Sequence, residues 1–192
     1  MDPHPDPSAA LDALLTAEID DALPPMLPFW GHTARADHPG QWVLSQWWPV
    51  DFDVHGVRYH HAEGYMMAEK ARLFGDDATR ERVIDAREPL HAKRLGRLVS
   101  GFEEELWIRN RYEIVVAGNR AKFGQHPDLR DYLVSTAPRV LVEASPVDRI
   151  WGVGLAPTDP AVATPSAWRG ENLLGFALMA VRDALTSETD DP

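Results

Sequence analysis

The scarcity of strand signals limits what this chain can fold into. The clearest strand pattern is VLVEAS at residues 140–145, a β-branched, apolar run between Pro138 and Pro146. Residues 41–58 form a second extended region, which we expect to be a hairpin with its turn at Gly56. Helical patterns dominate the remainder. The sequence therefore predicts an α+β fold, a helix-rich single domain with a small β-sheet.

Helix start and stop signals divide the rest of the chain. Gly75 suits the position after a helix end, Pro127 suits a first helical position, and three acidic residues at 103–105 suit a first turn. Four apolar residues of the last helix fall on one face, which predicts a buried stripe: Leu174, Leu178, Val181 and Leu185. The predicted helices are 59–74, 77–86, 88–98, 103–123, 127–135 and 172–186.

The two ends of the chain differ in composition from the middle. Residues 1–27 are acidic and Pro-rich, and we expect an appendage with one helix at 8–22, for which Ser8 is the candidate N-cap. Residues 188–192 are an acidic tail. The folded domain is therefore expected at 28–187.

Charge and composition exclude several classes of protein. The chain has 192 residues and a formal net charge of −11, which argues against tight binding to nucleic acid in general but not against a local pocket for one phosphorylated ligand. The N-terminus lacks the pattern of a signal peptide, and the sequence contains no membrane-spanning apolar run and no cysteine. These features predict a cytoplasmic protein without disulfides.

Two charged residues share the apolar face of the helix predicted at 59–74. Glu63 and Lys70 are seven residues apart, nearly two helical turns, so they point the same way as Met67 and Phe74. A carboxylate and an ammonium on an apolar face can be a structural ion pair, or a lysine that reaches out to water. They can also be catalytic groups in a cleft.

A second acidic position follows the strand predicted at 140–145. Asp148 lies three residues before Trp151, in a loop that also contains Gly152 and Gly154. Loops at strand ends often carry sites, although an ordinary Asx turn with a buried tryptophan explains the pattern equally well. Together, Glu63, Asp148 and nearby tryptophans would suffice to cleave a glycosidic bond.

Tryptophans and basic residues supply candidate ligand contacts. The chain has seven tryptophans, at positions 30, 42, 47, 48, 107, 151 and 168, and we expect about half of them to fill the core and a few to stack on a ligand. Arg94 and Arg97 lie on one side of a predicted helix and could bind phosphate, or could belong to a solvated face. His60, His61 and Glu63 match no zinc spacing, so we predict no metal site.

Seven blocks of sequence, in order, resemble the NADAR family, also called the YbiA-like or riboflavin-intermediate N-glycosidase family. The resemblance covers residues 29–185, and on it residues 28–187 are identified as a NADAR-like catalytic domain preceded by the appendage 1–27. The blocks are FWGH (29–32), SQWWP (45–49), AEGYMMAEKARLFGD (62–76), AKRLGR (92–97), AKFGQ (121–125), LVEASPVDRIWGVG (141–154) and WRGENLLGFALMAVRDAL (168–185).

The resemblance implies an N-glycosidase without a cofactor. Its substrates would be ribosylamino-pyrimidine intermediates of riboflavin synthesis, or ADP-ribose attached to guanine in nucleotides or in single-stranded nucleic acid. Catalytic roles are implied for Glu63 as acid/base, for Lys70 and for Asp148. Substrate-binding roles are implied or proposed for Trp47, Trp107, Trp151, Arg94, Arg97 and Asn172.

Two points stay open from the sequence. Lys70 could orient the sugar electrostatically, which we favour, or could attack C1 as an amine. A non-catalytic sensor of ADP-ribose or NAD derivatives is the alternative function, although it would not need Glu63 beside Lys70. One departure from the family is that Gly64 follows the key glutamate, where a ring-bearing residue is common, while His60 and His61 replace smaller residues.

Overall fold

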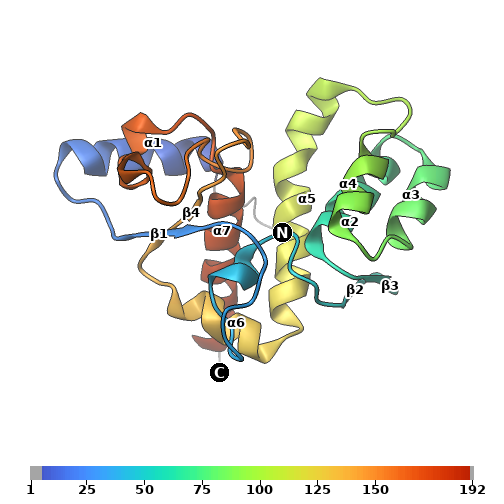
Figure 1. The fold of residues 1–192 in the computed structure, drawn as a ribbon, viewed down its shortest axis with the longest axis horizontal. Coiled ribbons are helices and arrows are strands. Elements are labelled where there is room, and N and C mark those ends of the chain that lie inside the picture. The colour runs from blue at the N-terminus through green and yellow to red at the C-terminus, as the bar shows by residue number, and fades with distance from the viewer. Residues whose placement is uncertain (1–5, 191–192) are drawn as a thin grey trace. The chain divides into compact units, whose positions relative to one another are not determined.

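The computed structural model describes residues 6–190 and has the predicted helix-rich α+β fold (Figure 1). It contains two compact units: the first comprises the chain up to Ser45 and from Asp128 onward, and the second comprises Gln46–Pro127. Residues 1–5 of the predicted appendage and 191–192 of the predicted tail lie outside the described residues. No helix among residues 6–190 is long and apolar enough to cross a membrane.

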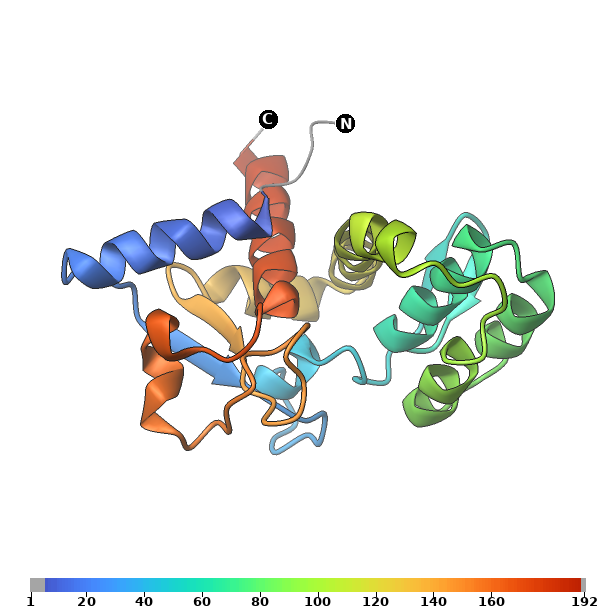
Figure 2. The same cartoon turned by 90° about the horizontal axis from the view of Figure 1, so that it is seen from above.

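The first unit is built around a short parallel sheet and one long helix. Strand β4 forms where the sequence predicts it, and its partner is β1, in the register Met26 to Val140 and Phe29 to Glu143 (Figure 2). Helix α7 packs on β4, and α1 packs on α7. The elements are α1 (Pro7–Ile19), β1 (Met26–Phe29), η1 (Gln41–Leu44), α6 (Pro127–Ser135), β4 (Val140–Glu143), η2 (Pro160–Ala163), η3 (Pro165–Ala167) and α7 (Leu173–Asp190).

The predicted stripe of α7 is confirmed as part of the core. Leu174, Leu178, Val181 and Leu185 are all buried, and they lie on the helix that covers β4. Burial of each such side chain contributes about 2 kcal/mol relative to exposure. The stripe therefore anchors the helix that follows the loop 145–154.

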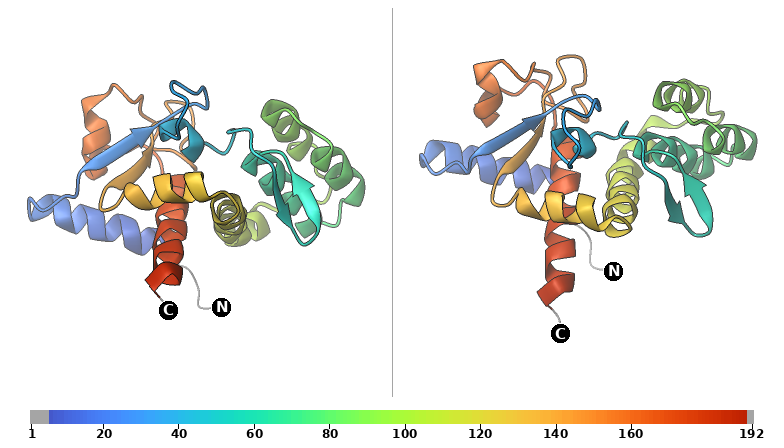
Figure 3. Two further views of the ribbon diagram at one scale, coloured as in Figure 1. Left: turned by 90° about the horizontal axis from the view of Figure 1, so that it is seen from below. Right: turned by 60° about the horizontal axis from the view of Figure 1, so that its bottom comes forward.

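The second unit is centred on helix α2. This helix packs against three others, α3, α4 and α5, and against β3. The predicted hairpin is present as β2 and β3, with His55 and Gly56 in the left-handed conformation of a two-residue turn (Figure 3). The elements are β2 (Phe52–Val54), β3 (Val57–Tyr59), α2 (Ala62–Leu73), α3 (Asp77–Ile84), α4 (Pro89–Gly96) and α5 (Glu104–Gly124).

Three local predictions are wrong. Residues 41–44 form a 3₁₀ turn, η1, instead of the start of the hairpin, because the amides of Val43 and Ser45 bond to carbonyls three residues back. Helix α1 begins at Pro7, and its N-cap is Asp6, whose carboxylate accepts from the amide of Ser8 at 3.0 Å. Strand β1 was not predicted, because prolines surround it.

Candidate active site

Helix α2 begins at an unusual cap. His61 is fully buried, and its Nδ1 accepts a hydrogen bond from the Gly64 backbone amide at 2.8 Å. This fixes the tautomer, because Nδ1 can accept only when it carries no proton. Burial lowers the pKa of His61 to about 4, so the ring is neutral near neutral pH. The cap therefore defines the first turn of α2, where Glu63 lies.

Glu63 is held from two directions. Its side chain is 3 % exposed, and the indole N–H of Trp47 donates to Glu63 Oε2 at 3.3 Å. Its backbone amide donates to the carbonyl of Gln46 at 3.0 Å. The Gln46 side chain is in turn bound by the amide of the buried Asn119, at 3.0 Å. The segment 46–47 thus orients the carboxylate through both backbone and side chain.

Lys70 lies two turns further along α2 and is half-buried. Its Nζ donates to the carbonyl of Gly96 at 2.9 Å and lies 4.2 Å from the ring centre of Phe102 and 5.7 Å from that of Trp107. Burial lowers the pKa of Lys70, and no carboxylate among the described residues pairs with it. The amine is therefore easier to deprotonate than an exposed lysine.

Gly96 allows the close contact between α4 and α2 that Lys70 uses. A Cβ atom at position 96 would lie 2.0 Å from the sulfur of Met67 and 3.1 Å from its Cβ. A larger residue would push α4 away from α2. The carbonyl that accepts from Lys70 would move with it, since that carbonyl belongs to the same residue.

The other predicted site residues of the second unit differ in their exposure and in their contacts with Glu63 and Lys70. Trp107, on α5, is half-buried and lies beside Lys70. Arg94 and Arg97, at the end of α4, are exposed, and neither has an ion-pair partner among the described residues. Lys93 Nζ lies 5.7 Å from the ring centre of Trp47. The structure therefore brings Glu63 and Trp47 together, and separately Lys70 and Trp107.

Asp148 and Trp151 belong to the first unit. Asp148 Oδ1 accepts hydrogen bonds from the amides of Ile150 at 2.9 Å and Trp151 at 2.8 Å, which is an Asx turn. The amide of Asp148 donates to Ser145 Oγ at 3.2 Å. The carboxylate thus shapes the loop after β4, and Trp151 remains half-exposed at its end.

Gly152 and Asn172 of this unit contact the backbone of β4. A Cβ at Gly152 would lie 2.6 Å from the carbonyl of Glu143, so this glycine permits close approach to β4. Asn172 is fully buried with a φ of 53°, and its amide group bonds to both Glu143 N at 3.0 Å and Leu141 O at 2.9 Å. Its side chain is therefore engaged by β4, and we expect it to hold the loop in place.

The expectation that about half of the tryptophans fill the core is wrong. None of the seven is fully buried, and Trp30 is 54 % exposed. Aliphatic residues, Phe and Tyr fill the core instead. The indoles lie at its margins, where one face or edge remains accessible.

Several residues that position these groups were missed by the sequence reasoning. Phe102 supplies the ring under Lys70, Asn119 holds Gln46, and His61 caps α2. A histidine cap has no strong sequence signal, since the residues that favour this position are Ser, Thr, Asp and Asn. Among residues 6–190, no group of three or more His, Asp or Glu side chains is arranged to hold a metal ion.

The arrangement in the second unit can perform acid–base chemistry. A carboxylate with little access to water is oriented by an indole N–H, and an amine with a lowered pKa lies two turns away on the same helix. Such a carboxyl group can transfer a proton to or from a bound substrate. The amine can bind an anionic or hydroxyl group, or attack an electrophilic carbon.

Comparison with known proteins identifies what the chain resembles. An N-glycosidase of Acanthamoeba polyphaga mimivirus is 40% identical over 157 residues, which cover 79% of this chain and 92% of that protein. N-glycosidase YbiA of Escherichia coli is 33% identical over 155 residues, covering 81% and 87%. The NMR structure of E. coli YbiA superposes with a TM-score of 0.71 at 28% identity, covering 88% of this chain and 89% of that one.

The family model agrees in extent with these relatives. The NADAR domain model matches residues 28–186, a range that includes the second half of β1, all of the second unit and most of α7. It contains each of the predicted site residues. The chain therefore belongs to the NADAR family.

Proposed function

We propose that this protein is an N-glycosidase that hydrolyses the bond between ribose C1 and a nitrogenous group. The observation that carries the proposal is the buried Glu63 carboxylate, oriented by Trp47, on the same helix as the half-buried Lys70. Two relatives over most of this chain are named N-glycosidases, which supports the same reaction.

Hydrolysis by water requires one acid–base group. Glu63 in its protonated form donates a proton to the leaving nitrogen as the C1–N bond breaks. Water adds to C1, and its proton passes to the carboxylate, which restores the acid on the next turnover. The products are the free ribosyl compound and the neutral nitrogenous group.

Attack by Lys70 is the alternative route. The neutral amine adds to C1 of the ring-opened ribose, the nitrogenous group leaves with a proton from Glu63, and water hydrolyses the resulting Schiff base. The lowered pKa of Lys70 and its lack of a carboxylate partner among the described residues both favour the neutral amine that this route needs. The structure thus supports this route more than the sequence did.

Borohydride reduction distinguishes the two routes. We expect the wild-type protein with substrate and borohydride to gain the mass of one reduced ribosyl adduct, with the adduct on Lys70. The Lys70→Arg variant keeps the positive charge but cannot form the adduct, and Lys93→Arg is the matched control. If wild-type protein turns over substrate and no adduct forms, attack by water is the route.

Two substrate classes follow from the family resemblance. They are ribosylamino-pyrimidine phosphates and ADP-ribose attached to guanine, free or in single-stranded nucleic acid. A riboflavin biosynthesis protein of Vibrio vulnificus is 30% identical over 142 residues, and the match covers 35% of that protein. Its name supports the first class. The net charge of −11 favours small substrates over duplex nucleic acid.

Product release assigns the substrate class. The purified protein is offered a ribosylamino-pyrimidine phosphate and, separately, guanosine-linked ADP-ribose, and the free base and free ribosyl product are measured. Release from one substrate only would name the class. Release from neither, with ADP-ribose still bound, would contradict the proposed hydrolysis and favour a binding sensor.

Other parts of the account remain predictions from the sequence. They are the catalytic role of Asp148, the ligand contacts of Trp151, Arg94 and Arg97, the cytoplasmic location, and the division into an appendage at 1–27, a catalytic domain at 28–187 and a tail. Asn172 is better explained by its bonds to β4 than by a ligand contact.

A further inference from the structure

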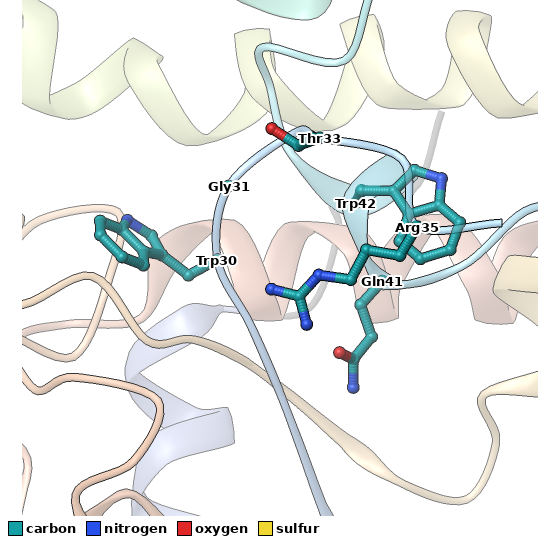
Figure 4. Close-up of a pocket in the computed structure, with 6 residues that line it drawn as sticks. All are labelled: Trp30, Gly31, Thr33, Arg35, Gln41 and Trp42. Atoms are coloured by element: carbon teal, nitrogen blue, oxygen red, sulfur yellow. The ribbon is translucent and has the colours of Figure 1, made fainter.

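The first unit contains a hollow that none of the proposed catalytic residues line. It has a volume of about 210 Å³ and is formed where the chain leaves β1 and enters η1 (Figure 4). Pockets for drug-sized ligands are larger, on the order of 300–1,000 Å³. The hollow therefore suits one ring system with a small substituent. Its lining residues are Trp30, Gly31, Thr33, Arg35, Gln41 and Trp42.

Two indoles, those of Trp30 and Trp42, are among the side chains that line this hollow. In Figure 4 the side chains of Arg35 and Trp42 lie on one side of the backbone at Gly31, and the Trp30 side chain points to the other side. Trp42 packs over Gly40, where a Cβ would lie 2.5 Å from the indole, so only glycine permits this position of the ring. Trp30 is 54 % exposed and follows the buried Phe29 at the end of β1. The backbone thus holds one indole in place and presents the other to solvent.

The polar groups of the hollow are not used within the protein. Among the residues that the structure describes, Arg35 has no ion-pair or hydrogen-bond partner, and the side chains of Thr33 and Gln41 make no hydrogen bond. The chain has 30 acidic and 19 basic residues, and Arg35 shares the hollow with two indoles and no carboxylate. A guanidinium group binds phosphate bidentately, and indoles stack on flat rings.

We propose that this hollow binds a nucleoside monophosphate group, with the base against the indole of Trp42 and the phosphate on Arg35. The amide of Gln41 and the hydroxyl of Thr33 each donate and accept, as the mixed edge of a base requires. A single arginine and one ring-sized space suit a free nucleotide better than a nucleic acid strand. The choice of a nucleotide among anionic aromatic compounds rests on the proposed function, whose substrates carry ribosyl phosphates.

NMR of the indole N–H groups tests the proposal. The ¹⁵N-labelled full chain is titrated with adenosine monophosphate, and the Trp30 and Trp42 signals are assigned with the variants Trp30→Phe and Trp42→Phe. We expect saturable shifts of these two signals among the seven indoles. Arg35→Gln should weaken binding of the nucleotide at least about tenfold. Adenosine, which lacks the phosphate, should bind the wild type as weakly as the nucleotide binds this variant. Arg109→Gln, a change at another exposed arginine, should have no effect.

Two outcomes would overturn the proposal. One is that the nucleotide leaves the Trp30 and Trp42 signals unmoved. The other is that inorganic phosphate binds as tightly as the nucleotide, since the indoles would then contribute nothing. The titration is repeated with Glu63→Gln, in which binding should persist because this hollow contains no group of the hydrolytic step. If the wild type binds the nucleotide here but hydrolyses neither substrate, the proposed function fails and this inference stands.

Discussion

Lys70 and Lys122 are two lysines that the fold withdraws from water to different degrees. Lys122, on α5, is fully buried, with its Nζ 4.8 Å from the ring centre of Phe123, and burial lowers its pKa to about 7. Lys70 is half-buried and its pKa is lowered for the same reason. Both cases follow from the cost of an ammonium group in a medium of low dielectric constant. For Lys122 this cost affects the free energy of unfolding. For Lys70 we propose that it affects the reactivity of the amine in catalysis.

The buried lysine predicts a dependence of stability on pH. The pKa of Lys122 is lower in the folded protein than the ordinary 10.5, so unfolding takes up a proton between pH 7 and pH 10.5 and the free energy of unfolding rises with pH in that window. From pH 7 to pH 9 the rise should be about 2 kcal/mol, measured by urea unfolding. Measurements stop at pH 9, because burial raises the pKa of Tyr65 to about 12 and this opposes the trend above pH 10.

The variant Lys122→Met should remove this rise, since its side chain has no proton to exchange. Lys93→Met, at a half-exposed lysine on α4, is the matched control and should keep the rise. An equal pH dependence in wild type and Lys122→Met would show that the buried lysine is not its source.

At the scale of elements, the start of α2 pairs a large residue at position 61 with a glycine at position 64. The imidazole of His61 takes the cap position, and a Cβ at residue 64 would lie 3.1 Å from its Cε1 and 3.3 Å from its Nδ1. With this imidazole at 61, a side chain at 64 would have to push the ring aside by a few tenths of an ångström. Glu63 lies between these two residues in the first turn of α2.

This pairing predicts a reversal of the usual effect of glycine in helices. Gly→Ala inside a helix normally stabilises by about 1 kcal/mol, but Gly64→Ala should destabilise the protein because the added methyl group presses on the buried imidazole. In the background of His61→Ser, which introduces a small cap, the same change should become neutral or stabilising. Thermal unfolding of the four proteins measures the coupling, and additive effects of the two changes would contradict it.

At the scale of the whole molecule, the features predicted correctly from the sequence are those that depend on local spacing of residues. The helices were found within a few residues, and the α7 stripe and the Gly56 turn were correct, since each rests on local spacing. Strand β1 was missed because only its pairing with β4, over 100 residues away, makes it a strand. Local propensity gives no signal for such pairing, and Pro28 argued against it.

The candidate site was predictable for the chemistry of its residues but not for their partners. The shared face of Glu63 and Lys70 follows from helical spacing alone. That Trp47 holds the carboxylate, that Phe102 lies beside the ammonium and that Asn172 bonds to β4 depend on contacts between distant segments. Tryptophan burial was wrong for the same reason, since composition does not say which side of an indole the fold covers.

The rate of hydrolysis by Glu63→Gln tests the central claim most directly. Gln keeps the shape of the side chain and its contact with Trp47 but cannot transfer a proton, so the catalytic rate should fall by about 10²- to 10⁴-fold. Thermal unfolding of the variant shows that it is folded, and Glu69→Gln, one residue before Lys70, is the matched control. A folded Glu63→Gln protein that hydrolyses substrate at the rate of the wild type would contradict the assignment of Glu63 as the catalytic acid/base.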